Sequence, residues 1–531
     1  MKSKDEDNMT PLPTDRPLNE SAASKPGSRR LWTWLLFFAA GGLLYGATMA
    51  PGLLWGDSGH AQLEILLGSW RLDADIARAH WVYCVIARFL DWLLPLESAR
   101  VANLVSVLGG ALTIANVAWL NATFAGSRVA VACGTALLAF AHTFWQLSTS
   151  AEVMTLSTAL LTLELMCVVT LVETGRLRWL AAALFANGLG VCNHNFALLM
   201  WPVYLATAWR YRRNWEGRCL RGAGVGAAAL LVGLAPLLFL CFAHYKATRD
   251  LTATLQSALF GHYGSRVLNV SGLPTLLLRS TGAFILNFPT PLVLLGAAGV
   301  LNLPRVGRRP VPFLIAGAAL VYAIFGVRYD VSDQYTFLLP AYVFVSIFAA
   351  IGIDRVIANQ RRPATRIAVC VLTPLAPLAY ALAPPLLNAY AAGTALMPTR
   401  DVPYRNRFEW FLRPWRAGYD GAERYARETL LSLPQSAWLA VDSTLCPPLN
   451  YLQVSESLRK DVRLDSWIAR QAWLNPLNLN CDDAFRARME KLSAGLLFSA
   501  AVENTYTQEW LHDPNLTFEP FGHVFRVRRH D

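Results

Sequence analysis

The sequence predicts a polytopic α-helical membrane protein of about eleven spans, followed by a C-terminal α/β domain on the outer face. Of its 531 residues, 54% are hydrophobic and 16% are charged, whereas about 25% of an ordinary soluble protein is charged. The apolar residues form blocks of roughly 20, the length at which a helix crosses a ~30 Å hydrocarbon core. The chain also contains 18 Trp, 17 Tyr and 25 Phe, and aromatic residues collect at membrane–water interfaces.

Residues 1–30 are polar and rich in Ser, Pro, Asp and Lys, which predicts a disordered cytoplasmic tail. The next apolar stretch is too long for a removed signal peptide and is expected to be the first span. We expect residues 31–386 to form the membrane domain. The predicted spans are 31–50, 101–121, 129–147, 153–173, 179–192, 195–209, 222–244, 283–302, 311–327, 336–354 and 367–386.

Arginine clusters in the short gaps between spans predict the orientation. The net charge is +11, and its basic residues gather where cytoplasmic loops are expected to be positive. A nucleic-acid groove would instead interleave basic and aromatic residues on one soluble surface, so no nucleic-acid partner is expected. Every cluster falls inside if 179–209 crosses twice, around Asn193-His194-Asn195. The arginine-rich, lysine-poor composition favours a bacterial inner membrane with the N-terminus in the cytoplasm.

Residues 387–531 predict a soluble periplasmic domain of mixed α/β character. Charge density rises there, "SAWLAVDS" and "AGLLFSAAV" are typical of buried strands, and "GYDGAERYARETLL" is typical of an amphipathic helix. Cys446 and Cys481 are the only two of the nine cysteines in this segment. We expect them to form a disulfide if the compartment is oxidising, and expect the other seven to be small buried hydrophobes.

Ionisable residues cluster at the predicted outer face. Such residues cost roughly 2.5–3.5 kcal/mol at the bilayer centre on insertion scales, so their presence near spans calls for a reason. The candidates are Asp57, His80, Glu152, His194, Arg328, Asp330 and Asp333. Each also has a structural interpretation: Asp57 suits a turn or helix N-cap, Glu152 a first helical turn, His194 a helix junction, and the two later aspartates a solvated turn. Their convergence on one face favours a functional site.

This set of groups suits transfer from a lipid donor linked through phosphate. A carboxylate can take the proton from an acceptor hydroxyl as general base. Cationic groups, or a divalent cation whose presence the sequence leaves open, can stabilise the departing phosphate. A donor embedded in the membrane would explain a site at the membrane boundary.

Three segments in order carry a family resemblance: "TMAPGLLWGDSGHAQL", "AHTFWQLSTSAEVMTLSTALL" and "GLGVCNHNFALL". They resemble the multispan family that includes the transmembrane protein 260 O-mannosyltransferases, within the GT-C glycosyltransferases that use polyprenyl-phosphate sugars. The resemblance covers roughly residues 40–210, and continues more weakly in "YDVSDQYTFLLPAY". It implies that Asp57 is the acid of the first loop, Glu152 that of the Ala-Glu-Val block and His194 part of the Asn/His turn. The family's His-Pro-Pro-Gly-Tyr-Pro segment is here "AHWVYCVIARFL", which keeps His80 and Tyr83 but neither prolines nor glycine.

The sequence therefore predicts an inverting glycosyltransferase of GT-C type. Asp57 is the expected general base, and Glu152 orients it or helps to hold a cation. The expected substrate contacts are His80, His194, Arg328, Asp330 and Asp333. The partners would be a polyprenyl-phosphate sugar, membrane lipid, and a protein, lipid or glycan acceptor. The alternative is a transporter or flippase of lipid-linked glycans, which would place polar groups near the midplane on broken helices.

Overall fold

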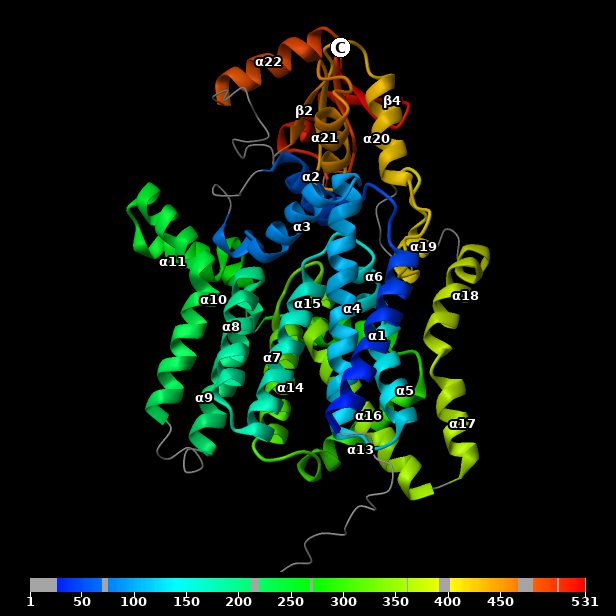
Figure 1. Cartoon of the computed structure of the whole chain (residues 1–531). Coiled ribbons are helices and arrows are strands. Elements are labelled where there is room, and N and C mark those ends of the chain that lie inside the picture. The colour runs from blue at the N-terminus through cyan, green and yellow to red at the C-terminus, as the bar shows by residue number, and fades with distance from the viewer. Residues whose placement is uncertain are drawn as a thin grey trace, which may run out of the picture.

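The long apolar segments form a helical bundle, and the C-terminal residues form a smaller domain at one end of it (Figure 1). The structure, a computed structural model, describes residues 26–68, 75–211, 219–267, 271–360, 362–390, 402–466, 481–503 and 506–530. Among these, seven helices are long and apolar enough to cross a membrane, or nine if each of two bent pairs counts as one span. These helices make the chain an integral membrane protein, as predicted.

The seven long spans match predicted ones. They are α1 (Pro26–Thr48), α4 (Ser98–Phe124), α7 (Met154–Thr174), α10 (Cys219–Thr248), α14 (Val311–Arg328), α16 (Leu339–Gln360), and the pair α17 (Pro363–Leu372) and α18 (Leu375–Tyr390). One bent pair joins α5 (Arg128–Ala139) to α6 (His142–Ser148) at 68°. The other joins α12 (Leu273–Asn287) to residues 291–305, which include α13 (Leu295–Asn302), at 118°.

The two remaining predicted spans correspond to α8 (Leu177–Asn193) and α9 (Met200–Arg210). They contain 17 and 11 residues, fewer than the roughly 20 that a straight crossing of the hydrocarbon core needs. A short 3₁₀ turn, η2 (Asn195–Leu199), separates them. The count of eleven therefore stays a prediction.

Small residues bring neighbouring helices close together. A Cβ atom at Gly233 of α10 would lie 2.5 Å from the carbonyl oxygen of Phe185 in α8, and α8 and α10 pack along much of their length. Close backbone approach at glycine is a common basis of helix association in membranes, where lipid and side chains are equally apolar.

The loops at the end of the bundle nearest the C-terminal domain contain their own short helices. The first loop holds α2 (Gly56–Leu67), η1 (Ile76–Arg78) and α3 (Trp81–Leu93). The second holds α11 (Leu251–Leu259) and η4 (Gly261–Arg266), and α15 (Gln334–Phe337) lies between α14 and α16. The figure shows α2 and α3 directly beneath the C-terminal domain (Figure 1).

The C-terminal domain has mixed α/β character, as predicted. Its five strands, in the order β2-β1-β3-β5-β4, are β1 (Trp438–Val441), β2 (Arg463–Ser466), β3 (Leu497–Ser499), β4 (Leu516–Phe521) and β5 (Val524–Arg529). β1 is parallel to β2 and β3, and the other pairs are antiparallel. The helices are α19 (Arg407–Leu412), α20 (Gly421–Ser432), α21 (Cys446–Ser455) and α22 (Cys481–Ser493). β1, β3 and α20 confirm the three segments predicted from their apolar patterns.

One hydrophobic core is shared by this domain and the first loop of the membrane domain. Alternate residues of β1 point to opposite faces of the sheet. Leu439 and Val441 belong to a buried cluster with Leu53, Trp55 and Leu63 of the first loop. The opposite face of the strand contributes to a smaller buried cluster.

Three boundary or pairing expectations need correction. α1 begins at Pro26 rather than after residue 30, and residues 1–25 of the predicted tail lie outside the described residues. α18 continues to Tyr390, past the predicted end at 386. Cys446 is a free, buried thiol whose sulfur accepts a hydrogen bond from Asn450 at 3.2 Å, so the predicted disulfide with Cys481 is wrong. Cys446 faces the shared core at the start of α21, which favours its packing over cross-linking.

Candidate active site

A cavity of about 1010 Å³ lies among the loops at the end of the bundle that faces the C-terminal domain. Six of the seven predicted site residues line it: Asp57, His80, Glu152, His194, Asp330 and Asp333. They come from segments far apart in the sequence, namely the first loop, the α6–α7 and α8–α9 connections, and the segment between α14 and α16. The cavity is large enough for a sugar and the phosphate group of a donor.

Asp57 is the second residue of α2, and its side chain is exposed at the cavity. The residue at the N-cap position is Trp55, so Asp57 does not cap the helix. An acid in the first turn is nevertheless favoured by the helix dipole. The backbone that leads to Asp57 is fixed by buried Gln62, which accepts a hydrogen bond from Leu54 N at 3.0 Å and donates to Gly52 O at 3.0 Å.

Glu152 lies in the short connection between α6 and α7. Its backbone N donates to Ser106 Oγ at 2.8 Å, and that hydroxyl donates to Glu152 O at 2.9 Å. The carboxylate oxygen Oε1 accepts a hydrogen bond from Ser58 Oγ at 3.0 Å. Ser58 follows Asp57 in the chain, so this bond connects Glu152 to the segment that carries the other acid.

Burial and electrostatic repulsion together change the protonation of this acid. Burial, followed by the charge of Asp57, raises the pKa of Glu152 to about 8, although the hydrogen bond from Ser58 acts in the opposite direction. An ordinary glutamate has a pKa near 4.3. Glu152 is therefore mostly protonated at neutral pH and can donate a hydrogen bond into the cavity.

Asp333 forms a third acidic position in the same cavity. It precedes α15, and its backbone oxygen accepts a hydrogen bond from Thr336 N at 2.9 Å. Burial, followed by the charge of Asp57, raises the pKa of Asp333 to about 6. Asp330 contributes its backbone N to a hydrogen bond with Arg266 O at 3.2 Å, which joins this segment to the second loop.

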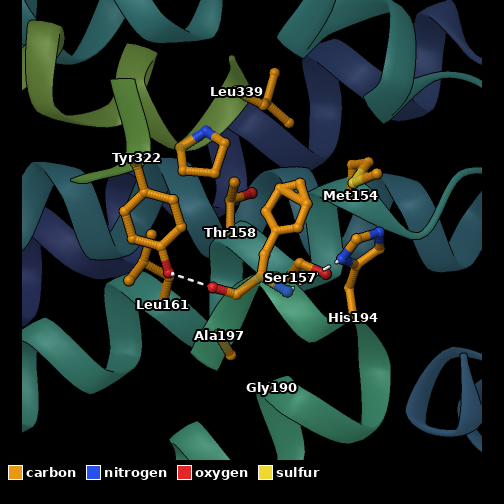
Figure 2. A pocket seen from close by; sticks show the side chains of 11 residues that line it. Met154, Ser157, Thr158, Leu161, Gly190, His194, Ala197, Tyr322 and Leu339 are labelled. Carbon is orange, nitrogen blue, oxygen red and sulfur yellow. Dashed lines mark hydrogen bonds between the residues drawn. The ribbon is translucent and has the colours of Figure 1, made fainter. Parts of the chain in front are cut away.

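His80 and His194 lie beside each other in the cavity wall. Their ring centroids are 5.7 Å apart and the rings are inclined by 18°. His80 Nδ1 is 2.8 Å from the backbone oxygen of Asn193. His194 Nδ1 accepts a hydrogen bond from Phe196 N at 3.3 Å. Figure 2 shows His194 next to Ser157 and Met154, at one side of a small hollow that also borders Tyr322.

The arginines of the cavity are not the predicted one. Arg78 of η1 and Arg266 of η4 line it, whereas Arg328 ends α14 and is not among its lining residues. The sequence offered one signal for Arg78, which precedes the candidate His80 by two residues. The sequence offers no such signal for Arg266, because nothing local indicates that the second loop folds back over the first.

The described residues do not form a metal-binding set. No group of three or more His, Cys, Asp or Glu side chains among them is arranged to hold a metal ion. Among the acids of the cavity, Glu152 accepts a hydrogen bond from Ser58, and Asp330 lies 3.7 Å from Arg279.

Comparison with known proteins agrees with this architecture. Residues 80–216 match the N-terminal domain of the protein O-mannosyl-transferase TMEM260. The crystal structure of ArnT from Cupriavidus metallidurans bound to undecaprenyl phosphate has a TM-score of 0.60 to this chain at 15% identity, and the match covers 93% of this chain and 97% of that one.

The chain has the fold of ArnT, and residues 80–216 resemble the N-terminal domain of TMEM260.

A second ArnT structure from the same organism, in the apo state, matches this chain with a TM-score of 0.56 at 16% identity, over 94% of this chain and 97% of that one. The comparison with curated proteins finds no match. The predicted resemblance, the GT-C-like membrane fold and the prediction of a GT-C glycosyltransferase are confirmed. The roles of individual residues rest on the geometry above and stay predictions.

Proposed function

We propose that this protein is an inverting glycosyltransferase that moves a sugar from a polyprenyl-phosphate donor to a hydroxyl acceptor. The observation that carries the proposal is the cavity in which Asp57 and Glu152 share a wall with Arg78 and Arg266. In one cavity, a carboxylate can take the proton of the incoming hydroxyl, and cations can stabilise the charge on the departing phosphate. The undecaprenyl phosphate bound by ArnT supports a donor of this class.

The reaction is a single displacement at the anomeric carbon. Asp57 takes the proton from the acceptor hydroxyl as its oxygen attacks that carbon from the face opposite the phosphate. The bond between the anomeric carbon and the phosphate oxygen breaks, and its electron pair leaves with the polyprenyl phosphate. One attack from the opposite face inverts the anomeric configuration. The exposed carboxylate of Asp57 suits the base, because an acceptor can reach it from the cavity.

Glu152 and the basic groups have separate tasks. With its raised pKa, Glu152 is neutral at pH 7 and can hydrogen-bond the acceptor or the sugar without adding a second negative charge beside Asp57. Arg78 and Arg266 are the residues proposed to neutralise the charge that develops on the phosphate. His80 and His194 contribute hydrogen bonds in the same region.

We place the active site on the outer face of a bacterial inner membrane, with the N-terminus in the cytoplasm. Arg30 at the start of α1 forms an ion pair at 2.8 Å with Glu173 at the end of α7. Arg29 donates to Gly126 O at 3.0 Å, in the connection between α4 and α5. These basic residues lie at the end of the bundle opposite to the cavity, which supports this orientation under the positive-inside rule.

The test is sugar transfer from a polyprenyl-phosphate donor in membranes that contain Asp57→Asn. Removal of the general base should lower the transfer rate by about 10²–10⁴-fold, while donor binding and detergent-extracted yield change little. The matched control is Glu173→Gln, which neutralises an acid at the opposite end of the bundle and breaks a partly exposed ion pair worth about 0–1 kcal/mol. It should transfer at the wild-type rate.

Three results would contradict the proposal. Normal transfer by well-folded Asp57→Asn would exclude Asp57 as the base. A product whose anomeric configuration equals that of the donor, measured by NMR, would exclude a single displacement. If wild-type protein moves a lipid-linked sugar across the membrane without transferring it, the transporter alternative is correct.

A further inference from the structure

Asn193 is a buried residue at the junction of three segments that line the cavity. It is the last residue of α8 and is 1% exposed. Its Oδ1 accepts a hydrogen bond from Tyr83 N at 3.0 Å, and its Nδ2 donates to Ser157 Oγ at 2.8 Å and to Val153 O at 3.1 Å. A buried amide whose donors and acceptor are all used is costly to replace, because its partners would lose their hydrogen bonds.

The bond to Tyr83 N caps another helix. Tyr83 lies in the first turn of α3, where backbone N–H groups have no partner within the helix. The N-cap residue of α3 is His80, and its side chain makes no capping bond. Asn193 supplies the acceptor from a different part of the chain. His80 itself has φ 41°, a left-handed conformation uncommon for a residue other than glycine, so its position depends on the groups around it.

The backbone oxygen of Asn193 also determines which nitrogen of His80 carries the proton. A carbonyl oxygen can only accept, so the Nδ1 of His80 that lies 2.8 Å away must be the donor. A neutral His80 then has its lone pair on Nε2. His194 has the opposite arrangement, because its Nδ1 accepts from Phe196 N and its proton is therefore on Nε2. In His80, therefore, Nδ1 donates and Nε2 can accept, whereas in His194 Nε2 can donate and Nδ1 accepts.

The bonds from Nδ2 reach the segment that carries the second acid. Val153 follows Glu152, and Ser157 lies one turn further along α7. Asn193 is therefore bonded to the segments of His80 and Glu152 and is adjacent to His194 in the chain. All three of these residues line the cavity.

We propose that Asn193 is a positioning residue: it fixes the tautomer of His80 and the placement of His80, His194 and Glu152 relative to one another. The catalytic consequence rests on the function proposed above, whereas the tautomer of His80 does not. Misplacement of reacting groups by about 1 Å can reduce a rate by on the order of 10²-fold. The sequence Asn193-His194-Asn195 points to His194 and does not indicate a role for Asn193.

The test compares Asn193→Asp with Asn116→Asp. Aspartate at 193 keeps the shape and can still accept from Tyr83 N, but it cannot donate to Ser157 or Val153. Asn116 of α4 has the same pattern of bonds: Oδ1 accepts from Trp34, and Nδ2 donates to Ala159 O and Thr162 Oγ1 of α7. It does not line the cavity. We expect Asn193→Asp to lower kcat about 10²-fold at nearly constant donor KM, and Asn116→Asp to leave kcat per folded molecule unchanged.

A milder variant and a spectroscopic measurement complete the design. Ser157→Ala removes one of the three side-chain bonds and should lower kcat less than Asn193→Asp does. Nitrogen-15 NMR of histidine-labelled protein in detergent, with His80→Gln to assign the signal, should show His80 protonated on Nδ1 in the wild type. Asn193→Asp keeps the backbone oxygen but loses the bonds of Nδ2, so the chemical shift of His80 should change because its ring is displaced. Unchanged kcat in Asn193→Asp, an equal fall in Asn116→Asp, or His80 protonated on Nε2 in the wild type would each overturn the proposal. Absence of sugar transfer by the wild type would overturn the proposed function instead, and the NMR result would still decide the tautomer.

Discussion

At the scale of the residue, the three acids of the cavity differ in their surroundings. Asp57 is exposed, whereas burial raises the pKa values of Glu152 and Asp333 to about 8 and about 6. Pairs of carboxyl groups with different environments can divide base and acid functions between them. Asp57 is the one of the three whose side chain is exposed at the cavity, where an acceptor hydroxyl can reach it.

The protonation of Glu152 should determine how the transfer rate depends on pH. The pKa of Glu152 is raised, so its stabilising contribution is complete below its unfolded value near 4.5 and is lost as the pH rises through about 8. Transfer should fall above pH 8, when an ionised Glu152 repels the charge at Asp57 and the departing phosphate. Glu152→Gln stays neutral, so its rate should lose this alkaline decline and fall less at pH 7 than that of Asp57→Asn. An alkaline decline of equal size in both proteins would assign it to another group. Initial rates from pH 6 to 9.5 measure the effect of pH on transfer, and the melting midpoint at each pH measures its effect on stability.

Much of the candidate site was predictable at this scale because its acids and histidines stand out against apolar surroundings. Arg78 and Arg266 were not selected, since arginines beside spans are ordinary and their entry into the cavity depends on the fold of two loops. Asn193 was equally inconspicuous, because an amide shows its function only when its partners from other segments are known.

At the scale of the element, α2 is held between the bundle and the C-terminal domain. A Cβ atom at Gly59 would lie 2.5 Å from Leu54 O and 2.8 Å from Pro447 Cβ of α21. Gly56 N donates to Thr444 O at 3.1 Å, one residue before the proposed base. The close approach of α2 and α21 therefore requires glycine at 59.

We predict that Gly59→Ala displaces α2 from α21. Overpacking of this kind costs about 1–3 kcal/mol, so the melting midpoint in detergent should fall, and transfer per folded molecule should fall because Asp57 lies on the same helix. The matched control is Gly46→Ala in α1, where a Cβ would meet nothing within 4 Å. If the two variants melt and transfer alike, α2 is not constrained at this contact.

Secondary structure was predictable where the pattern is local and less so where it depends on packing. The long apolar runs predicted α4, α7 and α16, and the short apolar runs predicted β1 and β3. The bends at 140–141 and 288–290 do not interrupt the apolar pattern and were missed. The predicted disulfide failed because two cysteines in one domain say nothing about the distance between them.

At the scale of the whole molecule, the C-terminal domain and the membrane domain are joined by polar bonds as well as by the shared core. Trp55 Nε1 donates to Tyr419 OH at 2.5 Å, and Ala99 N donates to Tyr451 OH at 3.0 Å. Arg416 N donates to Thr48 O at 2.9 Å, at the end of α1. The sequence predicted two domains but could not show these contacts, because they join residues more than 300 positions apart.

We predict that a chain that ends after Tyr390 inserts into the membrane and transfers no sugar. Without the domain, Leu53, Trp55 and Leu63 lose their buried surroundings, and residues 50–68 should become sensitive to protease. Arg528→Ala serves as the control, since it breaks only an ion pair whose side chains are both 52% exposed, and it should behave as the wild type. Full activity in the shortened chain would show that the domain serves another purpose.

The shared core also sets the order in which the protein becomes competent during synthesis. Residues 50–68 leave the ribosome well before residues 402–530, and at about 5–20 residues per second the interval is on the order of tens of seconds. During that time the apolar side of α2 has no covering surface from the C-terminal domain. The loop that carries Asp57 can reach its final position only after translation of the domain. We therefore expect a growing chain to be inactive until these last elements have folded.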